Sequence, residues 1–324
     1  MKGFDEELAE NFNLELDFDR EKFSLFLARA GIDIDVVKEQ ALYELGCGNL
    51  KGKDFLANNA CILLFAKKSE HFIEQSYVTC VRYHGNSMAT VIDRKDFHDT
   101  LISLVDEAEN FVKKHTRLAY KFEGFQRTDV EEYPYNAVRE ALINAVCHRD
   151  YSDKNNVFVN VFDDRIEVIS PGGIPGNLPL KEVYGRSHPR NHVVVKLFRR
   201  AHLVEKLGSG LKRMEEFMLL HGLKKPVYEA TQAYFKVTFN GPGNKLLDMV
   251  NPIRKINLKD LGLNDRQIKF LKTLQDLGGL TRKEFEKKFD LSKATSTRDL
   301  HELMKKGFVK AEGKGRQTRY QLIK

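Results

Sequence analysis

The sequence lacks a long apolar run. Its longest uninterrupted run, Ala60–Ala66, falls far short of the ~20 residues that a membrane-spanning helix needs. The segment Met1–Glu10 is acidic and polar, which is unlike the start of a secretory signal. The sequence therefore has neither a membrane-spanning segment nor a secretory signal of the usual kind, and it predicts a cytoplasmic protein.

Cysteine is scarce and scattered. The sequence holds four, Cys47, Cys61, Cys80 and Cys147, and none forms the C-x-x-C spacing of a zinc or redox motif. Two of them, Cys61 and Cys147, lie within apolar patterns. We therefore expect reduced, buried thiols rather than a disulfide framework or a metal site.

A P-loop is also missing. The closest approach to the motif GxxxxGK[ST] is the segment Gly46–Asp54, in which the first glycine is misplaced. Its Lys53 is followed by Asp54 instead of Ser or Thr, and no strand pattern precedes it. The sequence thus excludes a P-loop motor of the helicase type.

What the chain does contain is enough apolar material for several cores. Its 324 residues are 42% hydrophobic, which predicts two or three domains.

Charge is distributed unevenly along the chain. Residues 253–324 hold 19 Lys/Arg and 9 Asp/Glu, a balance of +10. The other residues have a balance of −3, which gives the net charge of +7. The junction contains Gly241-Pro242-Gly243-Asn244 and Asn251-Pro252, which is linker-like composition.

The segment Arg139–Tyr151 places chemistry on one stripe of a predicted helix. At about 100° per residue, Glu140, Asn144 and His148 follow one another within one polar strip, and apolar residues cover the rest of the circumference. A carboxylate that activates water and an amide oxygen that ligates a hard cation suit a Mg²⁺-nucleotide site. The alternative is the solvated face of an ordinary amphipathic helix.

Two glycine turns follow this helix. A predicted hairpin, Val157–Phe162 and Arg165–Ile169, leads into a turn that holds Gly172 and Gly173. A second turn, Gly208-Ser209-Gly210, precedes a helical pattern that runs to about Leu220. Glycines that open a helix let backbone N–H groups point at a phosphate. Each turn by itself is weak evidence for a phosphate site, because a Gly-Ser-Gly sequence is more often an ordinary loop.

The order of these motifs resembles the ATP-binding fold of DNA gyrase, MutL and sensor histidine kinases, called the GHKL or Bergerat fold. More closely, residues 133–241 resemble the ATPase-like region of RecG-related proteins that are described as DNA helicases or transcriptional regulators. The similar segments are EYPYNAVREALINAVCHRDYS, DDRIEVISPGGIP, SHPRN and VEKLGSGLKRM.

The resemblance implies ATP and Mg²⁺ as cofactors and a slow ATP hydrolase. Glu140 would be the general base and Asn144 the Mg²⁺ ligand. The residues implied in nucleotide binding are Asn144, His148, Gly172, Gly173, Gly208, Ser209 and Gly210. The adenine-binding Asp of the fold has no counterpart, since Ile169 and Ser170 stand at its place, so an intact and a degenerate site both stay open.

The start of the chain departs from the family pattern. RecG-related members usually carry an N-terminal Schlafen/AlbA-type domain, and this chain begins at about the point where that domain would end. Residues 1–116 are expected to be the α/β middle region of the family, and the apolar pattern Asn58–Ala66 predicts a strand within it.

The basic tail has the outline of a winged helix-turn-helix. Three helical patterns, Asp265–Leu277, Thr281–Phe289 and Ser292–Lys306, begin near residues that typically cap helices. Two strand patterns follow, Phe308–Ala311 and Arg319–Ile323. The third helix would enter the major groove of duplex DNA, while the wing between the strands would contact the backbone.

Candidate DNA contacts lie on the third helix and the wing. They are short polar or basic groups suited to base edges and phosphates: Lys293, Thr295, Ser296, Thr297, Arg298, Lys314, Arg316 and Arg319. A dimerisation or protein-binding module remains the alternative, because a run of lysines is often only a solvated face.

Together these features predict an α+β protein with a mixed α/β N-terminal region (1–116), a GHKL-like α/β sandwich (117–243) and a winged helix-turn-helix (253–324). The expected function is a cytoplasmic transcriptional regulator that binds double-stranded DNA and carries an intact or degenerate ATP-binding domain. A Mg²⁺-dependent ATPase that acts on DNA and an interaction scaffold without ligand are the alternatives, and the GHKL resemblance implies a homodimer.

Overall fold

A computed structural model describes two compact units, Met1–Val250 and Asn251–Lys324. Within them it describes residues 3–33, 37–52, 54–123, 126–185, 188–204, 208–243, 246, 262–313 and 318–323.

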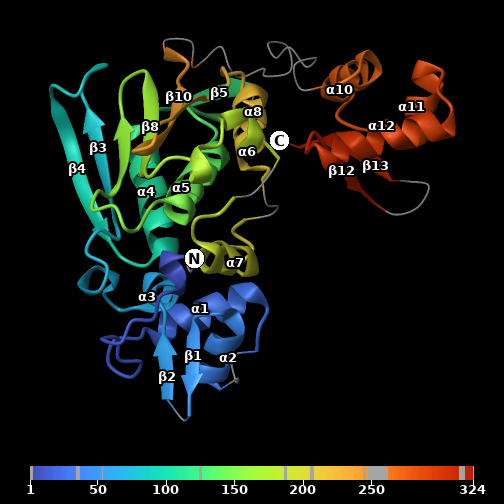
Figure 1. Cartoon of the computed structure of the whole chain (residues 1–324). Helices are drawn as coiled ribbons and strands as arrows, with labels where there is room; N and C mark the ends of the chain where they lie inside the picture. Colours follow the sequence, from blue (N-terminus) through green and yellow to red (C-terminus); the bar gives the residue numbers. More distant parts are fainter. Residues whose placement is uncertain are drawn as a thin grey trace. The chain divides into compact units, whose positions relative to one another are not determined.

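The first unit is built on a six-stranded mixed sheet with the order β4-β3-β7-β8-β10-β9 (Figure 1). Strand β3 runs parallel to β7, and every other neighbouring pair in this sheet is antiparallel. The strands are β3 (Tyr77–Tyr83), β4 (Val91–His98), β7 (Val157–Val161), β8 (Arg165–Pro171), β9 (Val227–Ala230) and β10 (Tyr234–Asn240).

Helices cover one face of this sheet (Figure 1). They are α4 (Leu101–His115), α5 (Tyr135–His148) and α8 (Gly210–Leu220), and α5 packs between α4 and α8. Helix α5 is buried over most of its circumference because alanine and branched apolar residues surround its polar stripe. The predicted α+β class, with a helical layer on one side of a mixed sheet, is confirmed.

The sheet crosses the boundary expected near residue 116. Strands β3 and β4 and helix α4 precede that residue, yet β3 pairs with β7 in the register Val78↔Val157. Parallel pairing needs a long crossover connection, and residues 84–156 supply it with β4, α4 and α5. The expected boundary therefore lies inside one compact unit.

A small subdomain precedes the sheet and contacts α7 (His192–Arg200). Its elements are η1 (Phe4–Glu6), α1 (Arg20–Ala30), α2 (Lys38–Leu45), β1 (Gly48–Lys51), β2 (Asp54–Ala57), α3 (Asn59–Phe65) and η2 (Ser69–His71). The strand predicted over Asn58–Ala66 is wrong, because the segment forms helix α3, which Asn58 caps by accepting from the N–H of Cys61. A helix buried on all sides has no polar face to reveal its period.

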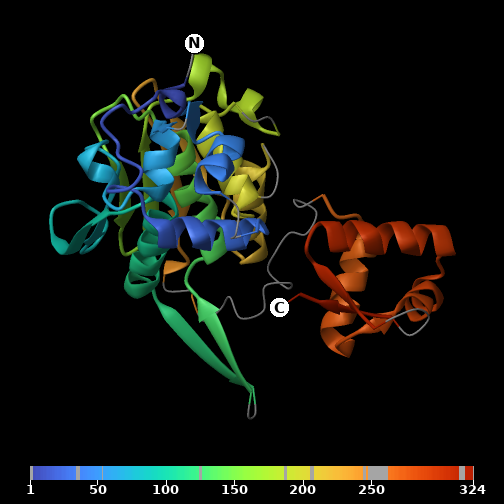
Figure 2. The same cartoon turned by 90° about the horizontal axis from the view of Figure 1, so that it is seen from below.

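The connections of the first unit contain further short elements. A hairpin of β5 (Leu118–Glu123) and β6 (Gln126–Glu131) extends away from the sheet (Figure 2). An ion pair between Arg117 and Glu132 joins the two ends of the hairpin at its base. The short helices η3 (Pro175–Asn177) and α6 (Leu180–Val183) follow β8.

All four cysteines are buried, as expected.

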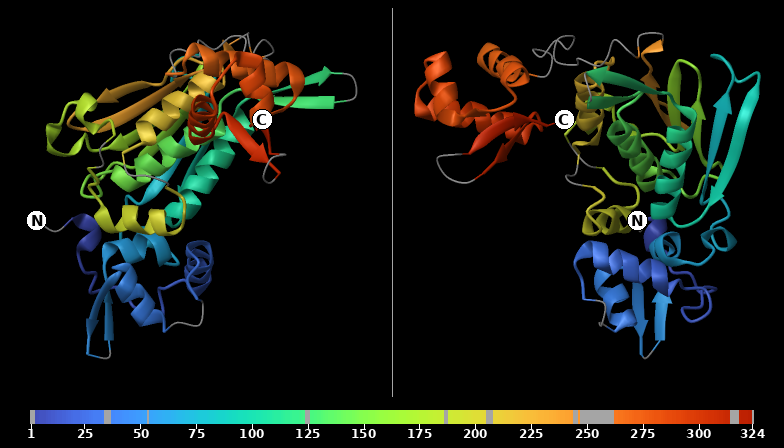
Figure 3. Two further views of the ribbon diagram at one scale, coloured as in Figure 1. Left: turned by 90° about the vertical axis from the view of Figure 1, so that its right-hand side faces the viewer. Right: turned by 180° about the vertical axis from the view of Figure 1, so that it is seen from behind.

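In its described residues, the second unit has three helices and a three-stranded sheet with the order β11-β13-β12 (Figure 3). Its elements are α10 (Asp265–Leu277), β11 (Leu280–Thr281), α11 (Arg282–Phe289), α12 (Lys293–Lys305), β12 (Val309–Glu312) and β13 (Arg319–Leu322). The rings of Phe270 and Phe285 pack in its core with centroids 4.1 Å apart. The predicted winged helix is confirmed. The three predicted helices and the two predicted strands begin and end within one residue of the bounds expected from the sequence.

Among the helices of the described ranges, none combines the length and the apolar composition that a bilayer crossing requires.

Candidate functional site

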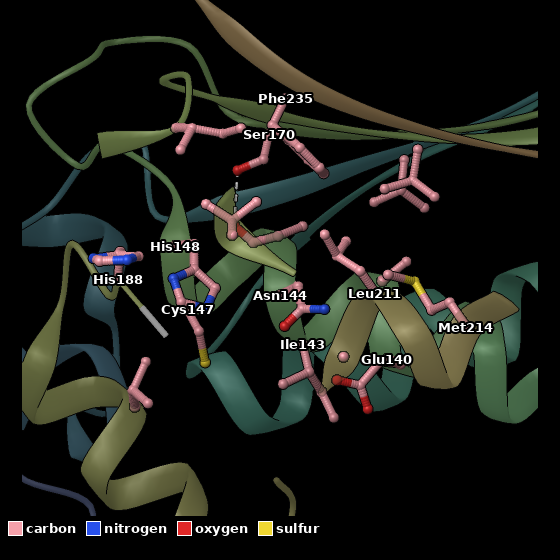
Figure 4. A pocket seen from close by; sticks show the side chains of 18 of the residues that line it. Glu140, Ile143, Asn144, Cys147, His148, Ser170, His188, Leu211, Met214 and Phe235 are labelled. Atoms are coloured by element: carbon pink, nitrogen blue, oxygen red, sulfur yellow. Dashed lines mark hydrogen bonds between the residues drawn. The ribbon is translucent and has the colours of Figure 1, made fainter. Parts of the chain in front are cut away.

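A pocket lies where α5, α8 and the glycine turns meet one end of the sheet (Figure 4). Its cavity volume is about 150 Å³, and Glu140, Asn144 and His148 all line it. The predicted polar stripe of α5 thus faces a cavity, with the three side chains in line along the helix (Figure 4). The remaining lining is mostly apolar and includes Ile143, Val168, Leu211, Met214, Phe235 and Val237.

Glu140 is buried, with 6% of its surface exposed, and it forms an ion pair across the helix interface. Its Oε2 lies 3.4 Å from Nη1 of Arg213, one turn into α8. Two other basic side chains, Arg190 and Lys212, pair instead with Asp150 and Glu216. The carboxylate is therefore neutralised inside the protein by a residue that sequence analysis did not single out.

Gly210 lets α8 approach α5 closely. A Cβ atom at this position would lie 2.6 Å from Glu140 Oε1 and 2.9 Å from Asn144 Nδ2. Mg²⁺ demands near-octahedral oxygen ligands at about 2.0–2.1 Å and usually keeps several waters. Of the two residues implied in Mg²⁺ chemistry, Glu140 already faces the Arg213 guanidinium, so the Asn144 side chain is the oxygen donor that would hold the ion.

His148 stands at the far end of the stripe and is half-buried. Burial, and next the nearby Arg190 guanidinium, lower the pKa of His148 to about 4. Asp150, two residues further along the chain, accepts a hydrogen bond from Arg190 at 2.7 Å. A neutral imidazole therefore faces the pocket at physiological pH.

The first glycine turn is held by the β9–β10 connection. The N–H of Gly172 donates to the carbonyl of Ala233 at 2.7 Å, and the N–H of Gly173 donates to that of Gln232 at 3.2 Å. A side chain at Gly173 would collide with the Thr231 carbonyl. Glycine is needed here for close backbone approach, and the two N–H groups already have acceptors within the protein.

The second glycine turn opens α8. Gly208, with a φ of +83°, and Gly210 both line the pocket, while Ser209 occupies the N-cap position without a side-chain cap bond. The carbonyl of Gly208 accepts from the N–H of Gly185 at 2.9 Å. Residues 205–207 of the VEKLGSGLKRM segment and Ser187 of SHPRN lie outside the described residues.

Two buried polar side chains of the turn regions hold the end of α5. Ser170, which stands at the place of the adenine-binding Asp, donates its hydroxyl to the carbonyl of Ala145 at 2.9 Å. Asn191 is fully buried and donates to the carbonyls of Cys147 and Arg149 at 3.0 and 2.9 Å, which ties the start of α7 to the end of α5.

Arg149 is a further residue that the sequence analysis did not single out. Only 1% of its surface is exposed, and its guanidinium donates to the carbonyl oxygens of Gln75 (2.6 Å), Asp153 (3.1 Å) and Asn155. These bonds fix the loop that follows α5 and thereby position His148. Arg149 lies in the segment His148–Tyr151, which the sequence analysis included in the motif of α5. Its role could not be predicted, because its hydrogen-bond acceptors are backbone carbonyls that no sequence pattern identifies.

A second candidate site is the exposed stripe of α12. Lys293, Ala294, Thr297, Arg298 and His301 line one shallow concave surface on this helix. The spacing i, i+1, i+4, i+5, i+8 puts them on a single helix face. Two of these residues, Ala294 and His301, were not among the predicted contacts.

The other predicted DNA contacts lie elsewhere. Ser296 is fully buried and donates to Glu286 Oε1 at 2.7 Å, so its hydroxyl has no access to DNA and its prediction as a contact is corrected. The hydroxyl of Thr295 bonds with that of Ser292, the N-cap of α12. Arg319 is exposed but donates to the Gly279 carbonyl at 3.0 Å. Lys314 and Arg316 lie outside the described residues.

Comparison with family models identifies both domains. Residues 154–239 match the model described as "Putative ATP-dependent DNA helicase recG C-terminal", and residues 263–312 match the MarR family. The chain therefore carries a recG-C-terminal-like, ATPase-like domain followed by a MarR-type winged helix. The predicted resemblance to RecG-related regulators is confirmed at the level of these two domains.

A solved structure with a similar fold is the DIP2311 protein from Corynebacterium diphtheriae. The two chains share 21% sequence identity at a TM-score of 0.65, and the match covers 99% of this chain. It covers 65% of that chain, so the present chain spans somewhat less than two thirds of its length. No curated protein sequence matches at a significant level.

Proposed function

We propose that this protein is a cytoplasmic transcriptional regulator that binds duplex DNA as a homodimer through α12 and its wing. The MarR-type winged helix is the observation that carries the proposal. The exposed stripe of α12 supports it, because Lys293 and Arg298 flank two small side chains, Ala294 and Thr297, that let the helix approach base edges. The balance of +10 in residues 253–324 favours attraction to phosphate.

The test compares DNA affinities of the full-length protein and two variants by fluorescence anisotropy. Lys293→Ala and Arg298→Ala should each weaken binding about 5- to 30-fold if the lost contacts are worth ~1–2 kcal/mol. Arg94→Ala removes an exposed arginine from β4 and is the matched control. Equal affinities of the wild type and both α12 variants would rule out this face of the helix.

The second candidate function is slow Mg²⁺-dependent ATP hydrolysis. It is favoured by the match to an ATPase-like family model and by the position of Glu140 and Asn144 on one wall of the pocket. The nucleotide would then also contact His148 and the glycine turns. Because Arg213 pairs with Glu140, this ion pair would have to open before the Glu140 carboxylate could act as a general base.

Phosphate release by the wild type and by Glu140→Gln decides on this second candidate. If Glu140 is a general base, the variant should lose turnover by about 10²–10⁴-fold. If Glu140 only pairs with Arg213, both proteins should release phosphate at the same background rate, and Glu140→Gln should only lower the melting temperature.

A further inference from the structure

We infer that the pocket between α5, α8 and the sheet is a metal-independent site for a small uncharged ligand with a planar apolar body and one polar group. The inference deepens the proposed function, on which it rests: the ligand would be the effector of the regulator. Nothing in the family matches assigns such a ligand.

The walls of the pocket set the shape and polarity of the ligand. Ile143 comes from α5, Val168 and Phe235 come from neighbouring strands, and Leu211 and Met214 come from α8. Ligand pockets are typically apolar with a few placed polar groups. An engineered apolar cavity of ~150 Å³ takes up benzene, and the present cavity of about 150 Å³ has a similar size.

The charges at the pocket are satisfied within the protein. Among the described lining residues the one carboxylate is Glu140, and Arg213 neutralises it at 3.4 Å. Burial keeps His148 neutral by lowering its pKa to about 4. A polyanionic ligand would have to replace its water shell with donors and cations. Here Arg213 is engaged with Glu140, and the N–H groups of Gly172 and Gly173 already donate to carbonyls.

Asn144 supplies the polar contact for the ligand. It is half-buried, it lies between Glu140 and His148 on the stripe, and its carboxamide faces the apolar walls (Figure 4). A carboxamide offers both a donor and an acceptor. It therefore orients a ligand that carries a single N–H or O–H group on an aromatic body, without any metal ion.

1-Aminonaphthalene, a small uncharged aromatic amine with two fused rings and environment-sensitive fluorescence, is the probe for this site. Its fluorescence should rise saturably with the full-length protein in EDTA, and Phe235→Ala should weaken binding about 10-fold. Leu211→Ala, on α8, should weaken binding in the same direction and serves if the first variant fails to fold. Phe158→Ala is the matched control, because Phe158 is half-buried on β7 and does not line the pocket.

Three results would overturn the inference: no saturable fluorescence rise, equal losses in Phe235→Ala and Phe158→Ala, or displacement of the probe by ATP that depends on Mg²⁺. The last result would assign the pocket to a Mg²⁺-nucleotide instead. None of these measurements contains DNA, so they can fail while the proposed DNA binding stands, and the anisotropy test can fail while the pocket binds the probe.

Discussion

His148 shows how the fold changes the chemistry of a single residue. In an unfolded chain its imidazole has a pKa near 6.5, whereas in the pocket burial and the Arg190 guanidinium lower the pKa to about 4. The unfolded state therefore binds the proton more readily than the folded state between these two values. The free energy of unfolding consequently falls as the pH drops from about 6.5 towards 4.

This difference in pKa gives a prediction for His148→Gln. Wild-type protein should lose ~1–3 kcal/mol of stability through this group between pH ~7 and pH ~4.5, whereas the variant lacks that contribution. Urea denaturation of both proteins at the two pH values measures it. Identical pH dependence in the two proteins would show that His148 is protonated as easily in the folded state as in the unfolded one.

At the scale of elements, the contact between α5 and α8 defines the site. Helix α8 begins at Gly210, and the absence of a side chain there brings its backbone against Glu140 and Asn144. The ion pair between Arg213 and Glu140 closes the same interface one turn further along. The glycine therefore serves helix packing in this structure, in addition to lining the pocket.

Gly210→Ala tests this packing because two effects oppose each other. Alanine gains about 0.5–1 kcal/mol in a helix relative to glycine. Overpacking typically costs about 1–3 kcal/mol, and the new Cβ would lie 2.6 Å from Glu140 Oε1. We expect a net decrease in the free energy of unfolding by chemical denaturation. A more stable variant would mean that α8 does not rest on Glu140 and Asn144 in solution.

At the scale of the whole molecule, the charges are divided between the two units. Residues 253–324 carry a balance of +10 while the remainder carries −3, so the DNA binding that we propose would depend on the charge of the winged-helix unit. Counterions released from the DNA make such binding strongly dependent on salt.

The predicted log–log slope of affinity against salt concentration is about −4 to −5, for a protein that neutralises ~5 phosphates. Lys293→Ala should make the slope shallower by about 1 if that lysine contacts a phosphate. Anisotropy titrations of the full-length protein at several salt concentrations measure both. A flat slope would leave the winged helix as a protein-interaction module.

The sequence by itself determined the elements that depend on near neighbours. The winged helix was predictable because Asn264, Thr281 and Ser292 each accept a hydrogen bond from the N–H three residues later, which is a local signal for a helix start. The polar stripe of α5 was predictable in the same way, because Glu140, Asn144 and His148 share one face at helical spacing. Helical periodicity and capping act over a few residues and are therefore visible in the sequence.

Only the tertiary structure decided which distant segments meet. Pairing of β3 with β7, the position of Arg213 beside Glu140 and the burial of Ser296 against Glu286 each join segments that are separated along the chain. The same holds for α3, whose apolar run fits a strand or a buried helix equally well until its surroundings are known. Contacts of this kind depend on the packing of the whole unit. The volume of the pocket and the charge of its lining residues therefore could not be predicted from the sequence.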